Sequence, residues 1–190
     1  GMNLVHVPST LVAMIDSSIG GKTAINFRET VNGIGSYYHP KANFLDLDLL
    51  VSLPEREFNS GMAEIIKCAV IADRDLLEFV KDKAKEIRKR DVQALKEIVA
   101  RTIRIKERYV RNDVKEGGAR LFLNYGHTLG HAIEMSTQGS EGEAFRHGEA
   151  VSLGMSAILK INELKYSLDA KIIAEVLDLL ELYDLPTSFS

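Results

Sequence analysis

Hydrophobic residues recur at spacings of three and four positions through nearly all of the chain after residue 46. This spacing places them on one face of a helix, and Pro54, Asp73 and Asp91 stand where helices would begin. The expected helices cover residues 47–52, 54–72, 74–90, 91–113, 117–136, 147–165 and 168–183. The pattern therefore predicts a mainly α protein with a helical domain over residues 47–190.

Residues 1–46 show a different pattern, with short apolar runs between small and polar residues. Segments 3–8 and 41–46 have the composition of short strands. The stretch 26–40, with Asn32 in the middle, is rich in Asn, Gly and Tyr without a clear period, which predicts an irregular loop that faces a ligand. We therefore expect short strands and ligand-facing loops in residues 1–46.

Residues 16–23 form a further small-residue loop in which Gly20 and Gly21 precede Lys22. Two glycines expose backbone N–H groups and the lysine adds a positive charge, which are the components of an anion-binding loop. The segment does not fit the common phosphate-loop motif because position 16 is Asp. A plain turn is the competing interpretation.

Composition excludes several classes of protein. The 190 residues are 45% hydrophobic and 27% charged, as in an ordinary soluble globular protein. A net charge of −3 offers no electrostatic basis for binding nucleic acid or an anionic membrane, and no apolar run is long enough to span a bilayer. We expect a cytoplasmic protein whose single cysteine, Cys68, is a small core residue.

Two histidines four positions apart suggest a metal site. His127 and His131 fall on one face of an expected helix, and Glu64 and His147 are candidate further ligands for zinc. The pair alone is not specific, because position 128 is Thr where a metalloprotease motif needs Glu, and a buried histidine bonded to backbone is the competing interpretation. Gly126 and Gly130 would each cost a helix about 1 kcal/mol, which indicates close approach of a backbone or a ligand.

Polar residues on otherwise apolar helices lie near these metal candidates along the chain. Lys67 follows Glu64 by one turn, and Lys106 lies on an Ile-rich helix. Arg120 and Asn124 precede His127 by seven and three positions. Each alone is compatible with a surface role, but cations, an amide and a metal in one cavity would suit a small, densely anionic and hydroxylated substrate.

Five segments carry a resemblance to a known family. They are 16–23 (DSSIGGKT), 53–57 (LPERE), 61–67 (GMAEIIK), 120–134 (RLFLNYGHTLGHAIE) and 147–150 (HGEA). In unbroken order from about residue 3 to 165, the chain resembles the 3-dehydroquinate synthase family of the sugar-phosphate cyclase superfamily. The likeness implies the helical C-terminal domain of that fold, with short N-terminal strands left from an α/β NAD-binding domain.

The resemblance implies a reaction and a set of residue roles. The family converts 3-deoxy-D-arabino-heptulosonate 7-phosphate to 3-dehydroquinate and phosphate in the shikimate pathway, with NAD and a divalent metal, Zn²⁺ or Co²⁺, typically as a homodimer. The matching metal ligands are Glu64, His127 and His147, and the matching proton acceptors are Glu116 and His131. The matching substrate contacts are Asp16, Lys22, Asn32, Lys67, Lys106, Arg120 and Asn124. The matching NAD contacts are Ser9, Thr10, Phe44, Leu45, Asp46 and Leu47.

Two departures from the family qualify these expectations. The family's glycine-rich dinucleotide-binding half is absent, so we expect this chain alone to be inactive and to hold NAD weakly. Val31 also stands where the family usually has a cofactor-contacting Lys. A cyclase similar to 2-deoxy-scyllo-inosose synthase is one alternative, which Asn124 and Lys22 disfavour. A non-catalytic domain that only dimerises or binds metal is another.

Overall fold

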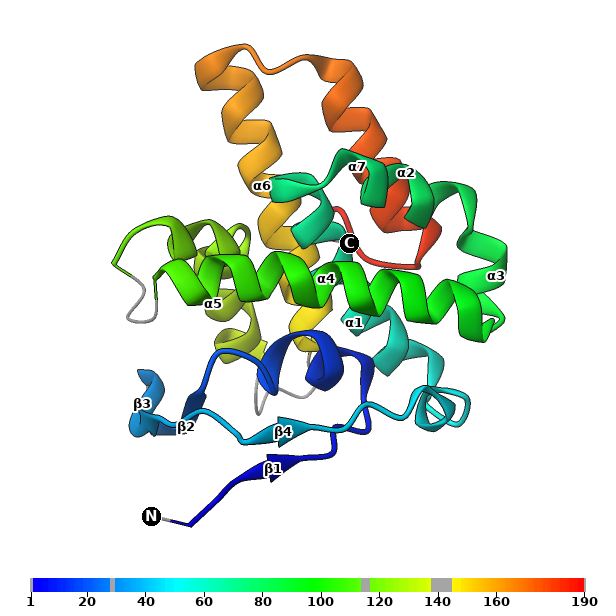
Figure 1. The fold of residues 1–190 in the computed structure, drawn as a ribbon. Helices are drawn as coiled ribbons and strands as arrows, with labels where there is room; N and C mark the ends of the chain where they lie inside the picture. Colours follow the sequence, from blue (N-terminus) through cyan, green and yellow to red (C-terminus); the bar gives the residue numbers. More distant parts are fainter. Residues whose placement is uncertain (1, 28–29, 114–116, 138–144, 190) are drawn as a thin grey trace.

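Helices make up most of the computed structural model, which describes residues 2–27, 30–113, 117–137 and 145–189, without the side chains of residues 26 and 30–32. The helices run in several directions around a central one and cover a small β region at one end (Figure 1). Their bounds are α1 Glu55–Ala72, α2 Arg74–Asp82, α3 Ala84–Arg88, α4 Val92–Asn112, α5 His127–Thr137, α6 His147–Tyr166 and α7 Ala170–Leu182. The predicted mainly α class is confirmed.

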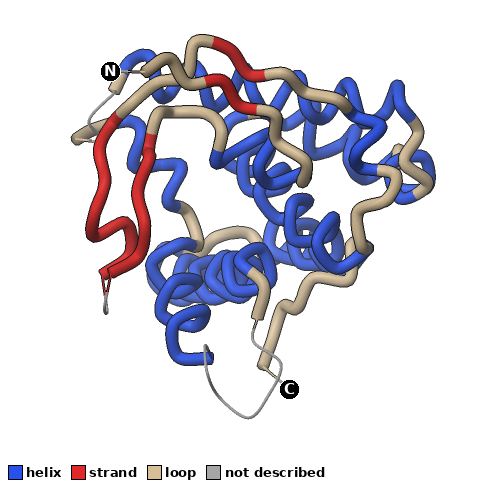
Figure 2. The backbone as a smooth tube through the Cα atoms, turned by 90° about the horizontal axis from the view of Figure 1, so that it is seen from below, coloured by secondary structure: helices blue, strands red, loops and turns tan. Residues whose placement is uncertain are grey.

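The strands form two separate pairs. β1 (Val5–His6) lies parallel to β4 (Ala42–Asn43), and β2 (Lys22–Phe27) lies antiparallel to β3 (Thr30–Tyr37). Figure 2 shows the β2–β3 hairpin extending along one side of the molecule, apart from the parallel pair. The two strands predicted over residues 3–8 and 41–46 therefore exist but are shorter than expected.

The loop predicted over residues 26–40 is wrong, because most of it belongs to this hairpin. Thr23 pairs with Ser36 and Ile25 with Ile34, and the register shifts between Ile25 and Phe27. Thr, Ile, Phe and Tyr favour a pleated strand, and their preference outweighs the glycines and asparagine that suggested a loop. Asn32 lies in β3, and its side chain is outside the described residues.

The single helix predicted over residues 117–136 is also wrong. A 3-10 turn covers Ala119–Asn124, a break follows, and α5 begins only at His127. Gly126 makes the break, because its φ of 80° is a left-handed conformation that glycine adopts without strain. Arg120 and Asn124 therefore approach the histidines from a separate turn and not from one shared helix face.

The helix predicted over residues 74–90 is divided as well. It is broken at Lys83 into α2 and α3. Val80, Ala84 and Ile87 remain buried across the break, so the apolar spacing continues and does not reveal it. A further helical turn, Ala13–Ser17, includes Asp16, so the loop predicted over residues 16–23 begins after this turn.

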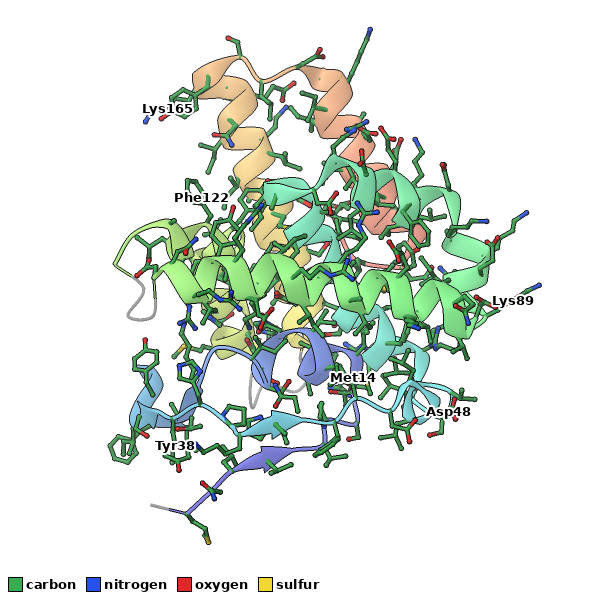
Figure 3. All side chains as sticks on the ribbon, in the orientation of Figure 1. Met14, Tyr38, Asp48, Lys89, Phe122 and Lys165 are labelled. Atoms are coloured by element: carbon green, nitrogen blue, oxygen red, sulfur yellow. The ribbon has the colours of Figure 1, made fainter. Side chains whose placement is uncertain are left out.

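α1 is the centre of the core. Apolar residues are buried on all of its sides, as expected of a helix surrounded by others, and it contacts α2, α4, α6 and α7. Leu11, Met14 and Ile15 belong to the same core, so the segment before residue 47 packs directly on the helices. Figure 3 shows Met14 inside the molecule and Lys89 and Lys165 projecting outward. The division into 1–46 and 47–190 stays a prediction.

None of the described helices combines the length and the hydrophobicity that crossing a bilayer requires.

Candidate metal and substrate site

A cavity of about 410 Å³ opens between the helical turn Ala13–Ser17 and α1, α4, α5 and α6. Most of the residues predicted to bind substrate or metal line it. The predicted residues on its wall are Asp16, Lys22, Lys67, Lys106, Arg120, Asn124, His127, His131 and His147. Glu116 lies outside the described residues, so the structure does not locate this predicted proton acceptor.

Glu64, whose side chain is 1% exposed, lies directly behind three residues of the cavity wall. It contacts Lys67, His127 and His147. Its Oε2 accepts a hydrogen bond of 2.5 Å from Lys67 Nζ, one turn along α1. Its Oε1 is buried and has no hydrogen-bond partner among the described residues. An unpaired buried carboxylate oxygen costs free energy, so this atom is suited to a ligand.

Two imidazole nitrogens face that oxygen. His127 Nε2 and His147 Nε2 each lie 3.4 Å from Glu64 Oε1, and the three ligand atoms all lie within 4.8 Å of one another. Ligand atoms about 2.0–2.1 Å from a tetrahedral zinc ion lie about 3.3–3.4 Å apart. The three side chains therefore have the chemistry and the spacing of a divalent-metal site, with the cavity as the open side.

Hydrogen bonds made by the other ring nitrogen, Nδ1, fix the orientation of each of these two imidazoles. His127 Nδ1 lies 3.2 Å from the carbonyl oxygen of Tyr125, and His147 Nδ1 lies 3.2 Å from Glu134 Oε2. Each oxygen accepts a hydrogen bond from Nδ1, which directs Nε2 toward Glu64. Histidines that bind metal ions usually have such a partner on the second nitrogen.

The charges around Glu64 shift several pKa values. Burial raises the pKa of Glu64, but the positive charges of Lys67 and His127 together lower it by more. The pKa of Glu64 therefore lies well below its usual value. Burial lowers the pKa of His127. For His147 the neighbouring carboxylates of Glu134 and Glu64 outweigh burial and raise the pKa to about 10. Glu64 is therefore an ionised carboxylate at neutral pH, as a metal ligand must be.

The cavity wall carries more positive than negative charge. Lys106 Nζ bonds the carboxylate and the carbonyl oxygen of Asp16, both at 2.5 Å. Burial raises the pKa of Asp16, and Lys106 lowers it to below its usual value. Among the described residues, one carboxylate, that of Asp16, lines the cavity, and that of Glu64 lies behind Lys67. Four side-chain cations line it: Lys22, Lys67, Lys106 and Arg120. Such a wall suits an anionic ligand.

Close packing of α5 on α6 brings the histidines together. A Cβ on Gly154 would lie 2.0 Å from the carbonyl oxygen of Gly126, and a Cβ on Gly130 would lie 3.2 Å from that of Ala150. Only glycine fits at the first position, so the two helix backbones touch there. The expectation that Gly126 and Gly130 mark the approach of another backbone is confirmed.

The start of α6 is held against α1 in a similar way. A Cβ on Gly148 would lie 2.0 Å from the carbonyl oxygen of Ser60, and Gly148 N donates to Ser60 Oγ at 2.9 Å. Arg56 donates two hydrogen bonds to Glu149, of 2.6 and 2.8 Å. His147 is the first residue of α6, so these contacts set its distance from Glu64 on α1.

A carboxylate at the end of α4 holds the segment that carries Arg120. Asp113 accepts hydrogen bonds from the backbone N–H groups of Gly117, Gly118 and Arg120 at 2.9, 2.7 and 3.1 Å. The Arg120 guanidinium reaches the carbonyl oxygen of Gly20 at 3.3 Å. It can do so because Gly20 has no side chain, since a Cβ there would lie 2.7 Å from Arg120 Nη2.

The residues predicted to contact NAD lie at a different place. Ser9 and Thr10 follow β1, and 44–47 follow β4, so both groups lie at the carboxyl ends of two parallel strands. In α/β proteins ligands bind at that edge of a sheet. None of the six predicted residues is among those that line the cavity.

Several residues at the site were not predicted. Glu134 is three positions after His131 and seven after His127, so helical spacing could have revealed it. Arg56 and Glu149 are 93 positions apart, and no spacing rule connects them. Val12, Ser17, Ile19, Ala24 and Leu123 complete the cavity wall and have no distinctive chemistry.

Two family models together match the whole chain. A model described as 3-dehydroquinate synthase C-terminal matches residues 61–190, and one described as 3-dehydroquinate synthase N-terminal matches residues 1–60. Curated relatives agree with both. A 3-dehydroquinate synthase of Idiomarina loihiensis is 41% identical over 98% of this chain and 52% of its own length, and one of Thermodesulfovibrio yellowstonii is 41% identical over 99% and 52%. The chain thus spans about half the length of the curated relatives it matches.

Solved structures share the fold. ValA, the 2-epi-5-epi-valiolone synthase of Streptomyces hygroscopicus subsp. jinggangensis 5008, with NAD⁺ and Zn²⁺ bound, has a TM-score of 0.90 and 28% identity over 98% of this chain and 51% of its own. A 2-deoxy-scyllo-inosose synthase complexed with carbaglucose-6-phosphate, NAD⁺ and Co²⁺ has a TM-score of 0.88 and 31% identity over 100% and 52%. With the two family matches, these likenesses show that the chain belongs to the 3-dehydroquinate synthase family.

Proposed function

We propose that this chain forms the metal- and substrate-binding part of an enzyme that converts 3-deoxy-D-arabino-heptulosonate 7-phosphate to 3-dehydroquinate and phosphate. Membership of the family supports the reaction, and the cationic cavity supports a sugar-phosphate substrate with a carboxylate. The cofactors in this proposal are NAD and a divalent metal, Zn²⁺ or Co²⁺, both of which occur in the names of the similar structures.

One observation carries the proposal. Glu64 Oε1 is buried without a hydrogen-bond partner among the described residues, and the Nε2 atoms of His127 and His147 lie 3.4 Å away on its open side. A carboxylate and two imidazoles from α1, α5 and α6 would hold a metal ion and leave its cavity side open for substrate oxygens.

The other proposed roles follow from the chemistry of the cavity wall. Bound NAD would supply transient oxidation of a ring alcohol, with hydride transfer from the carbon that bears the hydroxyl, and a bound metal would supply Lewis acidity at the oxygen, which together would acidify the neighbouring C–H bond. Lys22, Lys106 and Arg120 would hold the carboxylate and phosphate of the substrate. His131 would accept the proton that leaves the acidified C–H bond. Lys67 keeps Glu64 ionised through their hydrogen bond of 2.5 Å.

Four further substrate or catalytic roles belong to the same proposal. Asp16 would orient Lys106, to which it is hydrogen-bonded, and Asn124 would bind a substrate hydroxyl from the cavity wall. Asn32 and Glu116 are proposed on the resemblance alone. For NAD, the proposed contacts are the segments after β1 and β4, whose exposed residues lie at the carboxyl edge of a parallel strand pair.

Zinc titration of this chain by calorimetry tests the proposed ligands. We expect one site per chain in the wild type and loss of that site in His127→Ala, because two remaining ligands do not retain zinc. His39→Ala is the matched control, since His39 is exposed and is not among the residues that line the cavity. Equal zinc affinity in the wild type and His127→Ala would refute the assignment.

A second candidate is the reaction of the structural neighbour 2-deoxy-scyllo-inosose synthase, whose printed ligand is a carbaglucose-6-phosphate. Its substrate class lacks the carboxylate that the heptulosonate phosphate carries. Binding of both sugar phosphates to the zinc-loaded chain separates the two candidates. We expect the carboxylated substrate to bind more tightly, and Arg120→Ala to weaken it while zinc remains bound. Tighter binding of glucose 6-phosphate would favour the second candidate.

A homodimer in the cytoplasm is the third part of the proposal. The family resemblance suggests the dimer, and the exposed apolar side chains of Ile25, Phe27 and Ile34 on the β2–β3 hairpin are a surface that another protein segment would cover. Sedimentation velocity tests the association. A monomer at all concentrations would contradict the dimer for this chain.

A further inference from the structure

One carboxylate oxygen lies between two of the three clustered imidazoles. Glu134 Oε2 is 3.2 Å from His147 Nδ1 and 3.6 Å from His131 Nδ1. Glu134 and His131 are one turn apart on α5, whereas His147 begins α6. The same atom therefore contacts a proposed metal ligand and a proposed proton acceptor that come from two helices.

This arrangement selects one tautomer for both rings. A carboxylate oxygen only accepts hydrogen bonds, so His147 Nδ1, at 3.2 Å, must carry a hydrogen to bond it. His131 Nδ1, at 3.6 Å, is beyond hydrogen-bond distance, but the negative charge beside it favours the hydrogen on that nitrogen. The lone pair of a neutral ring is then on Nε2. For His147 this is the atom 3.4 Å from Glu64 Oε1. For His131, which lines the cavity, it is the ring nitrogen that does not face Glu134.

The packing around Glu134 makes the constraint effective. Its side chain is 26% exposed, so water competes only in part for the carboxylate. The ring centroids of His131 and His147 are 5.7 Å apart, and those of His127 and His131 are 5.4 Å apart. The three imidazoles pack against one another, so a change in the orientation of His131 would disturb its neighbours.

We propose that Glu134 is a positioning residue that holds Nδ1–H of His147, and orients Nδ1 of His131, toward its carboxylate, so that Nε2 of each ring is the nitrogen left to bind the metal or accept the proton. The inference rests on the proposed function for the roles of the two histidines. The contacts on which it depends, a hydrogen bond of 3.2 Å to His147 and an ion-pair contact of 3.6 Å to His131, do not involve a bound metal. Hydrogen-bonded partners of metal-binding histidines fix ring orientation and tautomer in this way.

The same three side chains offer another interpretation, because their ligand atoms also lie within 4.8 Å of one another. They could form a second metal site. That site would use His147 Nδ1, whereas the proposed metal ion uses His147 Nε2. The stoichiometry of zinc binding separates the two interpretations. One zinc ion per chain agrees with a positioning role, and a second ion lost in Glu134→Ala would overturn it.

Long-range ¹H–¹⁵N NMR spectra of the zinc-loaded chain read each histidine tautomer directly. We expect His131 to carry its hydrogen on Nδ1 in the wild type. In Glu134→Ala it should exchange between tautomers, and zinc affinity should fall about 10- to 100-fold. Glu134→Gln keeps an acceptor oxygen and the side-chain volume, so it should lie between the two. Glu163→Gln is the control, because Glu163 pairs with Lys160 on the exposed surface of α6.

The outcomes distinguish this inference from the proposed function. Failure of the wild-type chain to bind zinc would reject the proposed function. Normal zinc binding with an unchanged His131 tautomer in Glu134→Ala would reject only the role of Glu134. The amide spectrum checks that each variant is folded, and Glu134→Gln keeps the test decisive if Glu134→Ala unfolds.

Discussion

The guanidinium of Arg56 and the carboxylate of Glu149 form a bidentate pair, with hydrogen bonds of 2.6 and 2.8 Å. The pair joins the first turn of α1 to the first turn of α6. Glu149 Oε2 also accepts a hydrogen bond from the backbone N–H of Arg146 at 2.8 Å. Because His147 lies between Arg146 and Glu149, this contact holds a proposed metal ligand in place from outside the cavity.

Arg56 is not one of the proposed metal ligands, but its replacement should lower the affinity of the site for zinc. We expect Arg56→Ala to lower zinc affinity about 10-fold, as loss of an outer hydrogen-bonded partner does. Arg56→Lys should recover little, because an ammonium group cannot make the paired hydrogen bonds. Calorimetric titration with zinc gives both values.

The control for this prediction is a similar pair far from the site. Arg74 donates hydrogen bonds of 2.6 and 2.7 Å to Glu175, between α2 and α7. Arg74→Ala removes the same kind of contact and should leave zinc affinity unchanged. Equal effects of the two substitutions would show that Arg56 acts only through general stability.

The contact between α5 and α6 makes a second prediction. A methyl group added by Gly154→Ala would lie 2.0 Å from the carbonyl oxygen of Gly126 and force the helices apart. We expect the free energy of unfolding to fall by at least about 1–3 kcal/mol, the usual cost of overpacking. Zinc affinity should fall with it, because His127 and His147 lie on the two separated helices.

Urea unfolding of the same variants measures that loss. Gly117→Ala is the matched control, since an added Cβ there would have no atom within 4 Å. It should change the stability by little. A Gly154→Ala protein as stable as the wild type would mean that the two helices can adjust their distance, contrary to the geometry described above.

Cys68 makes a third prediction, on pH dependence. It lies on α1 beside Lys67, and burial raises the pKa of its thiol to about 12, although Lys67 acts in the opposite direction. An exposed cysteine has a pKa near 8.5 and reacts as the thiolate. Between pH 8 and 10 the native protein should therefore react slowly with a thiol reagent, whereas the urea-unfolded chain should react at once. Rapid reaction of the native protein at pH 8 would show that Cys68 is accessible.

The helical part of the fold could be predicted because its elements are amphipathic over long stretches. α4, for example, lies within one residue of its expected bounds, and Asp91 caps it by accepting a hydrogen bond from Ala94 N. The breaks at Lys83 and Gly126 were missed because apolar spacing continues across the first and because the conformation of a single glycine determines the second. Such conformations depend on tertiary contacts that periodicity does not record.

The site was predictable where one helix supplies several residues or where the family motif names them. Glu64, His127 and His147 meet as the resemblance implied, although they come from three helices. Arg56 was not assigned a role because its partner, Glu149, is distant in sequence. Contacts of this kind depend on how the helices pack, and a single sequence gives no spacing from which to infer them.

X-ray absorption at the zinc edge of the zinc-loaded chain measures the ligand set itself. We expect nitrogen and oxygen neighbours at about 2.0–2.1 Å, with the outer-shell scattering of two imidazoles that is lost together with the bound zinc in His127→Ala. A spectrum without imidazole scattering, or one that His127→Ala and His147→Ala leave unchanged, would contradict a site built from Glu64, His127 and His147.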